Sequence, residues 1–134
     1  MIITSGGLRT ADGSMSAIWT DRIGFKSIFD GSSNTFLAGE MHISEGQINV
    51  TPFNGPMYNG SELVAHSRIG GPGIPILNDN QEAGPIFGFG TSHPGGCNFV
   101  VADGSTRTQR RTTDTVLLAN LCHREDGAVT NNGQ

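Results

Sequence analysis

Serine, histidine and aspartate lie close together between residues 92 and 103, and these three residue types can perform nucleophilic catalysis. Ser92 and His93 are adjacent, and Asp103 follows after nine intervening residues. A hydrolase of the strand–turn–helix type needs its serine in a G-x-S-x-G elbow, which this sequence does not contain. Asp103 also falls in a predicted hairpin turn, where it can satisfy the backbone instead of orienting a histidine. The sequence therefore disfavours a Ser/His/Asp hydrolase.

Two short runs of oxygen-bearing side chains have the donor types that a hard cation such as Ca²⁺ prefers. One run contains Asp30, Ser32 and Asn34, and the other contains Asp103 and Ser105. The same side chains also hydrogen-bond nearby backbone amides in tight turns. We favour the second interpretation, in which these groups satisfy their own turns.

Zinc and phosphate motifs are not indicated. The two cysteines, Cys97 and Cys122, form no C-x-x-C pair, and the four histidines lack ligand spacing. The GGPG run at residues 70–73 lacks the Lys-Ser/Thr of a phosphate loop. We expect both cysteines to be buried small hydrophobes, with a strand-to-helix disulfide as the alternative in an extracellular domain.

A β-hairpin is the clearest structural signal. Residues 97–102 form an apolar run, Asp103 and Gly104 follow, and residues 105–110 tolerate a strand. An Asp-Gly pair between two extended runs favours a two-residue type I′ turn, because both turn positions need positive φ. In that register Phe99 and Val101 share one face, and the residues between and beside them share the other. We expect the first strand to be central.

The second hairpin strand carries the main cluster of basic residues, namely Arg107, Arg110 and Arg111. Three charges at one strand end are typical of a solvated sheet edge. The net charge of −4 and the single lysine, Lys26, lack the basic footprint of a nucleic-acid-binding protein. We therefore expect no nucleic-acid partner.

We expect a single domain of the α+β class, mainly β, over all 134 residues. The 20 glycines argue for many turns and long loops instead of long helices. The expected parts are a loose arm (1–16), first strands with a turn (17–43), a Gly/Pro-rich excursion (44–84), the hairpin (85–111), a C-terminal helix (112–127) and a tail (128–134).

The expected strands and helices place several polar residues. Residues 23–29 predict one helical turn packed on the sheet, and residues 35–43 predict a strand. Glu40 shares a strand face with Phe36 and Ala38, so it needs a hydrogen-bond donor or a cation if that face is buried. In the C-terminal helix we expect Thr112 or Thr113 as the cap and Gly127 as the closing residue. Asp114 then lies in the first turn and the apolar stripe contains Val116, Leu117, Leu118 and Leu121.

Two longer patterns resemble signatures of one bacterial family. Residues 28–40 read I-x-DG-x-SNT-x-x-x-GE, and His93 to Gly104 read H-x9-DG. The chain resembles the prepilin-type, pilin-like proteins with an H-x9-DG C-terminal domain, a family described as of unknown function and once labelled solute-binding. The likeness covers roughly residues 10 to 130. Its motif residues in this chain are Asp30, Gly31, Asn34, Thr35, Glu40, His93, Gly95, Gly96, Asp103 and Gly104.

The resemblance implies a pilin-like or pseudopilin-like globular head with an antiparallel sheet, displayed outside the cytoplasmic membrane. The basic leader and long apolar helix that open such family members are not seen here, so we expect no membrane insertion by these residues. The implied role is structural or secretory and non-catalytic, and the implied partners are other pilin-like subunits or secretion components. The alternative is an extracytoplasmic module that binds a small ligand or carbohydrate through loops 44–84.

The resemblance also raises a cation hypothesis, because calcium stabilises some major pseudopilins of type II secretion. Glu40, His93 and Asp103 would converge on a bound Ca²⁺, although no cofactor is otherwise expected. The alternative is structural: Asp30 and Asn34 would lock a turn, Asp103 would close the hairpin, and Glu40 and His93 would pair with each other.

Overall fold

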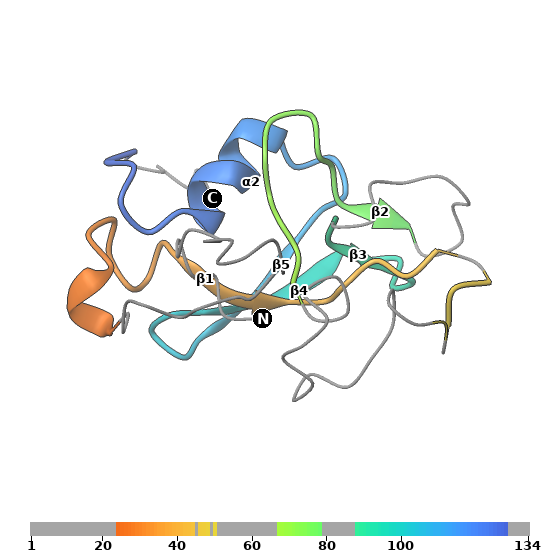
Figure 1. The fold of residues 1–134 in the computed structure, drawn as a ribbon, viewed down its shortest axis with the longest axis horizontal. Coiled ribbons are helices and arrows are strands. Elements are labelled where there is room, and N and C mark those ends of the chain that lie inside the picture. Colours follow the sequence, from red (N-terminus) through yellow and green to blue (C-terminus); the bar gives the residue numbers. More distant parts are fainter. Residues whose placement is uncertain (1–23, 45, 49, 51–66, 79–87, 129–134) are drawn as a thin grey trace, which may run out of the picture.

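The computed structural model describes residues 24–44, 46–48, 50, 67–78 and 88–128 (Figure 1). The expected arm at 1–16, the beginning of the expected first strands at 17–43, most of the excursion at 44–84 and almost all of the tail lie outside these residues. The elements are a 3₁₀ turn η1 (Phe25–Ser27), strands β1 (Phe36–Gly39), β2 (Leu77–Asn78), β3 (Gly90–Thr91), β4 (Cys97–Val101) and β5 (Thr106–Gln109), and helix α2 (Thr115–Cys122).

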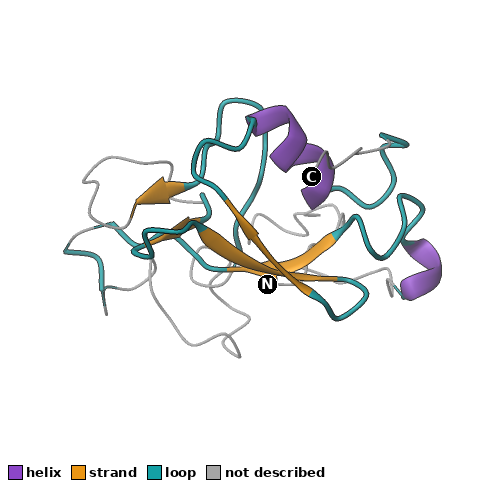
Figure 2. Cartoon of the chain, turned by 180° about the vertical axis from the view of Figure 1, so that it is seen from behind, coloured by secondary structure: helices purple, strands orange, loops and turns teal. Residues whose placement is uncertain are grey.

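An antiparallel sheet of three strands organises the described part of the chain. The strand order is β1-β4-β5, so β4 is central, as predicted. Strands β2 and β3 form a separate parallel pair, with Leu77 opposite Gly90. Figure 2 shows α2 lying over one side of the strands. The expected class, α+β and mainly β with an antiparallel sheet and one short C-terminal helix, is confirmed.

Strand β4 has one buried and one exposed face. Its residues alternate strictly, with Cys97, Phe99 and Val101 buried and the two residues between them exposed. The prediction that Phe99 and Val101 share a face is therefore confirmed. The opposite face is open to solvent, and Val100 there is 39% exposed.

Three aromatic rings form the centre of the core. Phe36 from β1 stacks on Phe99 with ring centroids 4.3 Å apart. Phe89, just before β3, meets the same Phe99 ring edge-on at 4.9 Å. Leu118 and Leu121 of α2 belong to the same buried cluster, so the helix contributes its buried side to this core. Burial of large aromatic rings stabilises a core strongly.

The hairpin turn differs from the predicted two-residue type I′ turn. The Gly104 N–H donates to the Val101 carbonyl at 2.9 Å, and the Val101 N–H donates to the Ser105 carbonyl at 2.8 Å. The loop therefore contains three residues, 102–104, and its last residue, Gly104, has a φ of 88°. This arrangement fits a tight turn followed by one residue with positive φ, a common alternative for hairpins. The Asp-Gly pair still lies in the hairpin loop, but it occupies the second and third loop positions instead of the expected first and second.

The C-terminal helix is shorter than predicted. Its cap is Asp114, whose carboxylate accepts the N–H groups of Val116 and Leu117 at 2.9 and 3.0 Å. The expected threonine caps and the closing role of Gly127 are therefore wrong, because α2 ends at Cys122. The buried positions are Leu118, Leu121 and Cys122, whereas Val116 of the expected stripe is 52% exposed.

Three expectations for the first described segment are also wrong. The 3₁₀ turn forms, but Phe25 and Phe29 are 75% and 74% exposed, so they do not pack on the sheet. The strand expected over 35–43 ends at Gly39, with a register shift between Phe36 and Ala38. Phe36 therefore lies opposite the buried Val101 and Ala38 opposite the exposed Val100, so the prediction that Phe36 and Ala38 share a strand face is wrong.

The cysteines are free and buried, as predicted. Cys97 lies in β4 and Cys122 ends α2, and both belong to the core cluster. Burial raises the pKa of the Cys122 thiol to about 12, although a hydrogen bond from the Gly70 backbone acts in the opposite direction. The alternative strand-to-helix disulfide is not formed.

Removing the central ring should test the core directly. We expect Phe99→Ala to lower the free energy of unfolding by about 3–5 kcal/mol, because the substitution leaves a cavity beside two aromatic rings. Urea unfolding followed by circular dichroism measures the change. The neighbouring Val100→Ala, on the open face of the same strand, should change it by less than about 1 kcal/mol. Equal losses in both variants would contradict the assigned faces of β4.

Candidate functional site

Glu40 connects the end of β1 to the start of β4. Its carboxylate accepts the Asn98 backbone N–H at 2.8 Å and the Asn98 side-chain amide at 3.3 Å. Its own N–H donates to the Asn98 carbonyl at 3.1 Å, and its carbonyl accepts the Gly90 N–H at 3.2 Å. Because β1 ends at Gly39, the carboxylate supplies the acceptor that a further strand residue would have supplied. The predicted need of Glu40 for a donor is thus met by Asn98.

His93 lies beside the same carboxylate. Its Nε2 is 3.3 Å from a Glu40 oxygen, and its side chain is 61% exposed. The His93 N–H donates to the Thr91 hydroxyl at 3.1 Å, which fixes the turn that carries the imidazole. The structure therefore brings two of the expected motif residues, Glu40 and His93, into contact at the molecular surface.

The electrostatic balance at Glu40 favours its charged form. Partial burial is the largest single influence and acts to raise the pKa of Glu40. Hydrogen bonds from the Asn98 backbone, the Asn98 side chain and Thr91, together with the charge of His93, outweigh it and hold the pKa below its ordinary value of 4.5. The group therefore acts as a hydrogen-bond acceptor and an anionic contact, and not as a proton donor at neutral pH.

These contacts extend into a polar row across the open face of the sheet. The Thr108 hydroxyl of β5 donates to the Asn98 side-chain oxygen at 2.7 Å, opposite it in the register. Asn98 in turn donates to Glu40, which faces His93. We call Thr108, Asn98, Glu40 and His93 the polar row. It links β5, β4, the end of β1 and the turn after β3 on one exposed surface.

Asp103 lies apart from the polar row. Its carboxylate accepts the Ser105 N–H at 2.9 Å, within the hairpin turn. The pKa of Asp103 is lowered because the hydroxyl and the N–H of Ser105 both donate to the carboxylate. Glu40 binds the start of β4 and Asp103 follows its end, so at about 3.3 Å per residue they are roughly 15 Å apart. Glu40, His93 and Asp103 therefore do not form one cluster.

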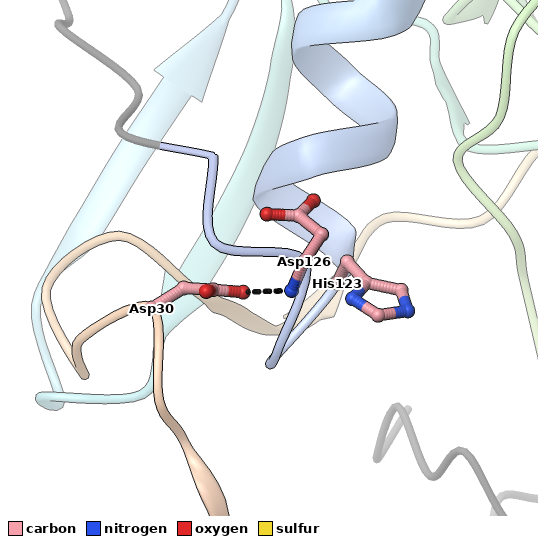
Figure 3. Close-up of side chains that lie close together, drawn as sticks. All are labelled: Asp30, His123 and Asp126. Atoms are coloured by element: carbon pink, nitrogen blue, oxygen red, sulfur yellow. Dashed lines mark hydrogen bonds between the residues drawn. The ribbon is translucent and has the colours of Figure 1, made fainter.

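Asp30 joins the turn before β1 to the segment after α2. Its two carboxylate oxygens accept the N–H groups of Asp126 and Gly127 at 2.9 and 2.8 Å, and Figure 3 shows the first of these contacts. The turn itself is closed by Asn34 and Thr35, which contact the carbonyls of Asp30 and Gly31. The turn is thus partly self-satisfied, as predicted, but the Asp30 side chain makes a long-range contact that the sequence did not indicate.

The motif glycines differ in whether the backbone at their position requires a glycine. Gly96 has a φ of 127°, and a Cβ there would collide with the Gln109 carbonyl oxygen. Gly95, directly before it, would place a Cβ in open space and lacks a positive φ. Gly31 and Gly104 have φ values of 92° and 88° in their turns. Of the two adjacent glycines after His93, backbone geometry therefore requires only the second.

The carboxylates of the two signatures are used mainly as acceptors for backbone N–H groups. Asp30, Glu40 and Asp103 each bind at least one backbone amide, two of them on distant segments. Asn98 and Asp126, which complete these contacts, were not singled out from the sequence. An Asp-Gly pair at residues 126–127 was the available signal, since such pairs mark turns.

In the described residues no helix is long and apolar enough to cross a membrane.

A family comparison covers most of the chain. The model SBP_bac_10, described as "Protein of unknown function (DUF1559)", matches residues 4–116. The chain belongs to this family. Both signatures, residues 28–40 and 93–104, lie inside the matched region of this DUF1559 member. Neither the curated proteins nor the solved structures contain a match to the chain.

The two adjacent glycines after His93 provide a matched test of the motif. We expect Gly96→Ala to lower the free energy of unfolding by about 2 kcal/mol or more, because it adds backbone strain and a steric collision with β5. Gly95→Ala should change stability by less than about 0.5 kcal/mol. Urea unfolding of both variants measures the difference. If both were equally stable, the close contact between residue 96 and β5 would be incorrect.

The charge on Glu40 should make part of the stability pH-dependent. Because its pKa is lower in the folded than in the unfolded chain, ionised Glu40 stabilises the fold above the unfolded pKa. This contribution is lost as the pH falls through the folded pKa. We therefore expect Glu40→Gln to be about 1 kcal/mol less stable than the native chain at pH 7, with the gap closing below about pH 4.

Urea unfolding of the native chain and Glu40→Gln across this pH range measures the gap. Glu125→Gln is the control, since Glu125 forms an exposed ion pair with Arg124 at 2.8 Å and is 41% exposed. That variant should differ from the native chain by less than about 1 kcal/mol at pH 7. A Glu40→Gln gap that stays constant down to pH 3 would show that the charge of Glu40 does not support the fold.

Proposed function

We propose that this DUF1559 member is a non-catalytic, pilin-like or pseudopilin-like globular head that acts through protein–protein contacts in a structural or secretory role. The observation that carries the proposal is the use of the signature side chains. Glu40 holds Asn98 at a sheet junction, and Asp30 holds the backbone at Asp126. Signature side chains that form hydrogen bonds within the fold are expected in a protein that works by presenting a surface to its partners.

The chemistry of the described residues also favours a non-catalytic role. His93 contacts Glu40, but Asp103 lies at the other end of β4, so the Ser/His/Asp grouping considered from the sequence is not assembled there. The two thiols are buried, and the raised pKa of Cys122 keeps its thiol protonated. These groups therefore lack the arrangement that a nucleophilic mechanism requires.

The open side of the sheet offers a surface for such contacts. It presents Asn98 and Val100 of β4 opposite Thr108 and Thr106 of β5. This surface mixes one exposed aliphatic side chain with polar groups, a composition typical of non-obligate protein interfaces. Strand β5 is also an edge of the sheet, and its exposed end carries Arg110. We propose other pilin-like subunits or secretion components, outside the cytoplasmic membrane, as the partners.

Site-specific photo-crosslinking in the native host tests this function. A photoreactive residue replaces Val100 on the open face, in the protein expressed from its own gene. Replacement of Ser33, an exposed residue of the turn before β1, is the control. We expect crosslinks from position 100, but not 33, to another pilin-like subunit or secretion component. Crosslinks from neither position, or a cytoplasmic location on fractionation, would contradict the proposal.

The alternative function is an extracytoplasmic module that binds a small ligand or carbohydrate through loops 44–84. The family label SBP_bac_10, which hints at binding, favours it. Most of these loops lie outside the described residues. A rise in melting temperature with one sugar or amino acid from a panel, but not with its stereoisomer, would support this alternative over the pilin-like role.

A further inference from the structure

Two carboxylates and an imidazole lie near one another where the turn before β1 contacts the segment after α2, and Figure 3 shows the Asp126 carboxylate and the His123 ring pointing in different directions. Asp30, His123 and Asp126 each offer a ligand atom, and these atoms all lie within 4.8 Å of one another. We propose that these three residues bind a divalent transition-metal ion of the zinc type. The site is separate from the polar row, and the proposal does not depend on the pilin-like function.

The backbone that carries the three ligands is held together by other contacts. The N–H groups of Phe29 and Asp30 donate to the Arg124 carbonyl at 2.8 and 3.2 Å. The Arg124 guanidinium donates to the Ser27 carbonyl at 2.8 Å, so the two segments are joined in both directions. The ligands therefore come from a preorganised frame. A metal ion that binds there has little backbone ordering to impose.

The donor set selects the kind of ion. Calcium takes oxygen ligands, whereas an imidazole nitrogen with carboxylates suits zinc and its neighbours among the divalent transition metals. Asp30 and Asp126 provide two negative charges that balance the ion. His123 and Asp126 are exposed, so water can occupy the fourth position. Three protein ligands with one water is a common coordination for zinc.

Small side-chain movements complete the geometry. Ligand atoms around a tetrahedral zinc at about 2.1 Å lie about 3.4 Å apart, so atoms that are now up to 4.8 Å apart need to approach by up to about 1.4 Å. One Asp126 oxygen accepts the Ala128 N–H at 2.6 Å, which leaves its other oxygen for the ion. The His123 Nδ1 accepts the Glu125 N–H at a long 3.3 Å, and water can replace this exposed contact. Both Asp30 oxygens accept backbone N–H groups, so Asp30 would bind the ion through a remaining lone pair, and the exposed His123 and Asp126 side chains would make the adjustment.

A bound ion would add a coordination bond from His123 to a junction now held by hydrogen bonds. It would connect residues 24–30 to residues 123–127. The expected effect is stabilisation, because the ion resists separation of the two segments, even though three protein ligands with one water is the coordination of catalytic zinc sites.

Zinc titration of the tag-free full chain, after treatment with a chelator, tests the site. Isothermal titration calorimetry should give about one ion per chain. Thermal melting should show a rise of roughly 5–10 °C when free zinc is about a hundredfold above its Kd. Absence of both effects would overturn the proposal. An equal rise with Ca²⁺ that persists in His123→Gln would also overturn it, because an oxygen site would then explain the effect.

Two histidine variants give a matched comparison. His123→Gln should abolish the zinc-induced rise, and His93→Gln, which changes the exposed histidine beside Glu40, should keep it. Loss of the rise only in His93→Gln would place the ion at Glu40 and overturn the assignment. Asp126→Asn should weaken zinc binding at least tenfold, because it removes a charged ligand.

A measurement on the native chain tests the site without a substitution, so its result does not depend on whether a variant folds. Ring ¹⁵N resonances of the histidines report directly on metal coordination. We expect zinc to shift the His123 ring resonance by many parts per million and to leave that of His93 in place. A His123 resonance that does not respond at saturating zinc would overturn the proposal.

Discussion

The packing of the Phe99 ring between Phe36 and Phe89 is the constraint on which the rest of the structure depends. These rings come from β4, from β1 and from the residue before β3, so their contact fixes three segments at once. A Cβ at Gly39 would lie 2.6 Å from the Phe99 ring, so any larger residue there would have to displace that ring. The next residue, Glu40, holds β4 through its backbone. The adjacent Gly-Glu pair thus makes room for the core and fastens the same strand.

The fold class followed from local sequence pattern, whereas the ends of the elements did not. The period of two of a strand predicted that Phe99 and Val101 share a face of β4, whereas the structure shows that only this face is buried. The Asp-Gly pair located the hairpin but could not distinguish a two-residue from a three-residue loop, since both use Gly104 at positive φ. Likewise Thr112, Thr113 and Asp114 can all cap a helix. In the structure Asp114 is the cap, and the helix that it begins places Leu118 in the core.

The candidate site was predictable to the extent that its chemistry is local. A carboxylate among apolar strand residues implied that Glu40 has a donor, and the proximity of His93 to it was one of the expected pairings. The donor itself, Asn98, is 58 residues away, and partners at such separation leave no periodic signal in one sequence. The same holds for Asp30, which was expected to satisfy only its own turn. Its contact with residue 126 depends on where α2 ends, and this end was predicted incorrectly.

The burial of the two free thiols has a consequence for how the chain matures. Cys97 and Cys122 are 0% and 7% exposed, so oxidants reach them only before the sheet and α2 have come together. Closure is delayed, because β1 must pair with a strand that begins about sixty residues later, and such non-local pairing slows folding. In an oxidising compartment, folding and oxidation of the two thiols therefore compete. Fast folding preserves them reduced, and slow folding exposes them to mispairing with other chains.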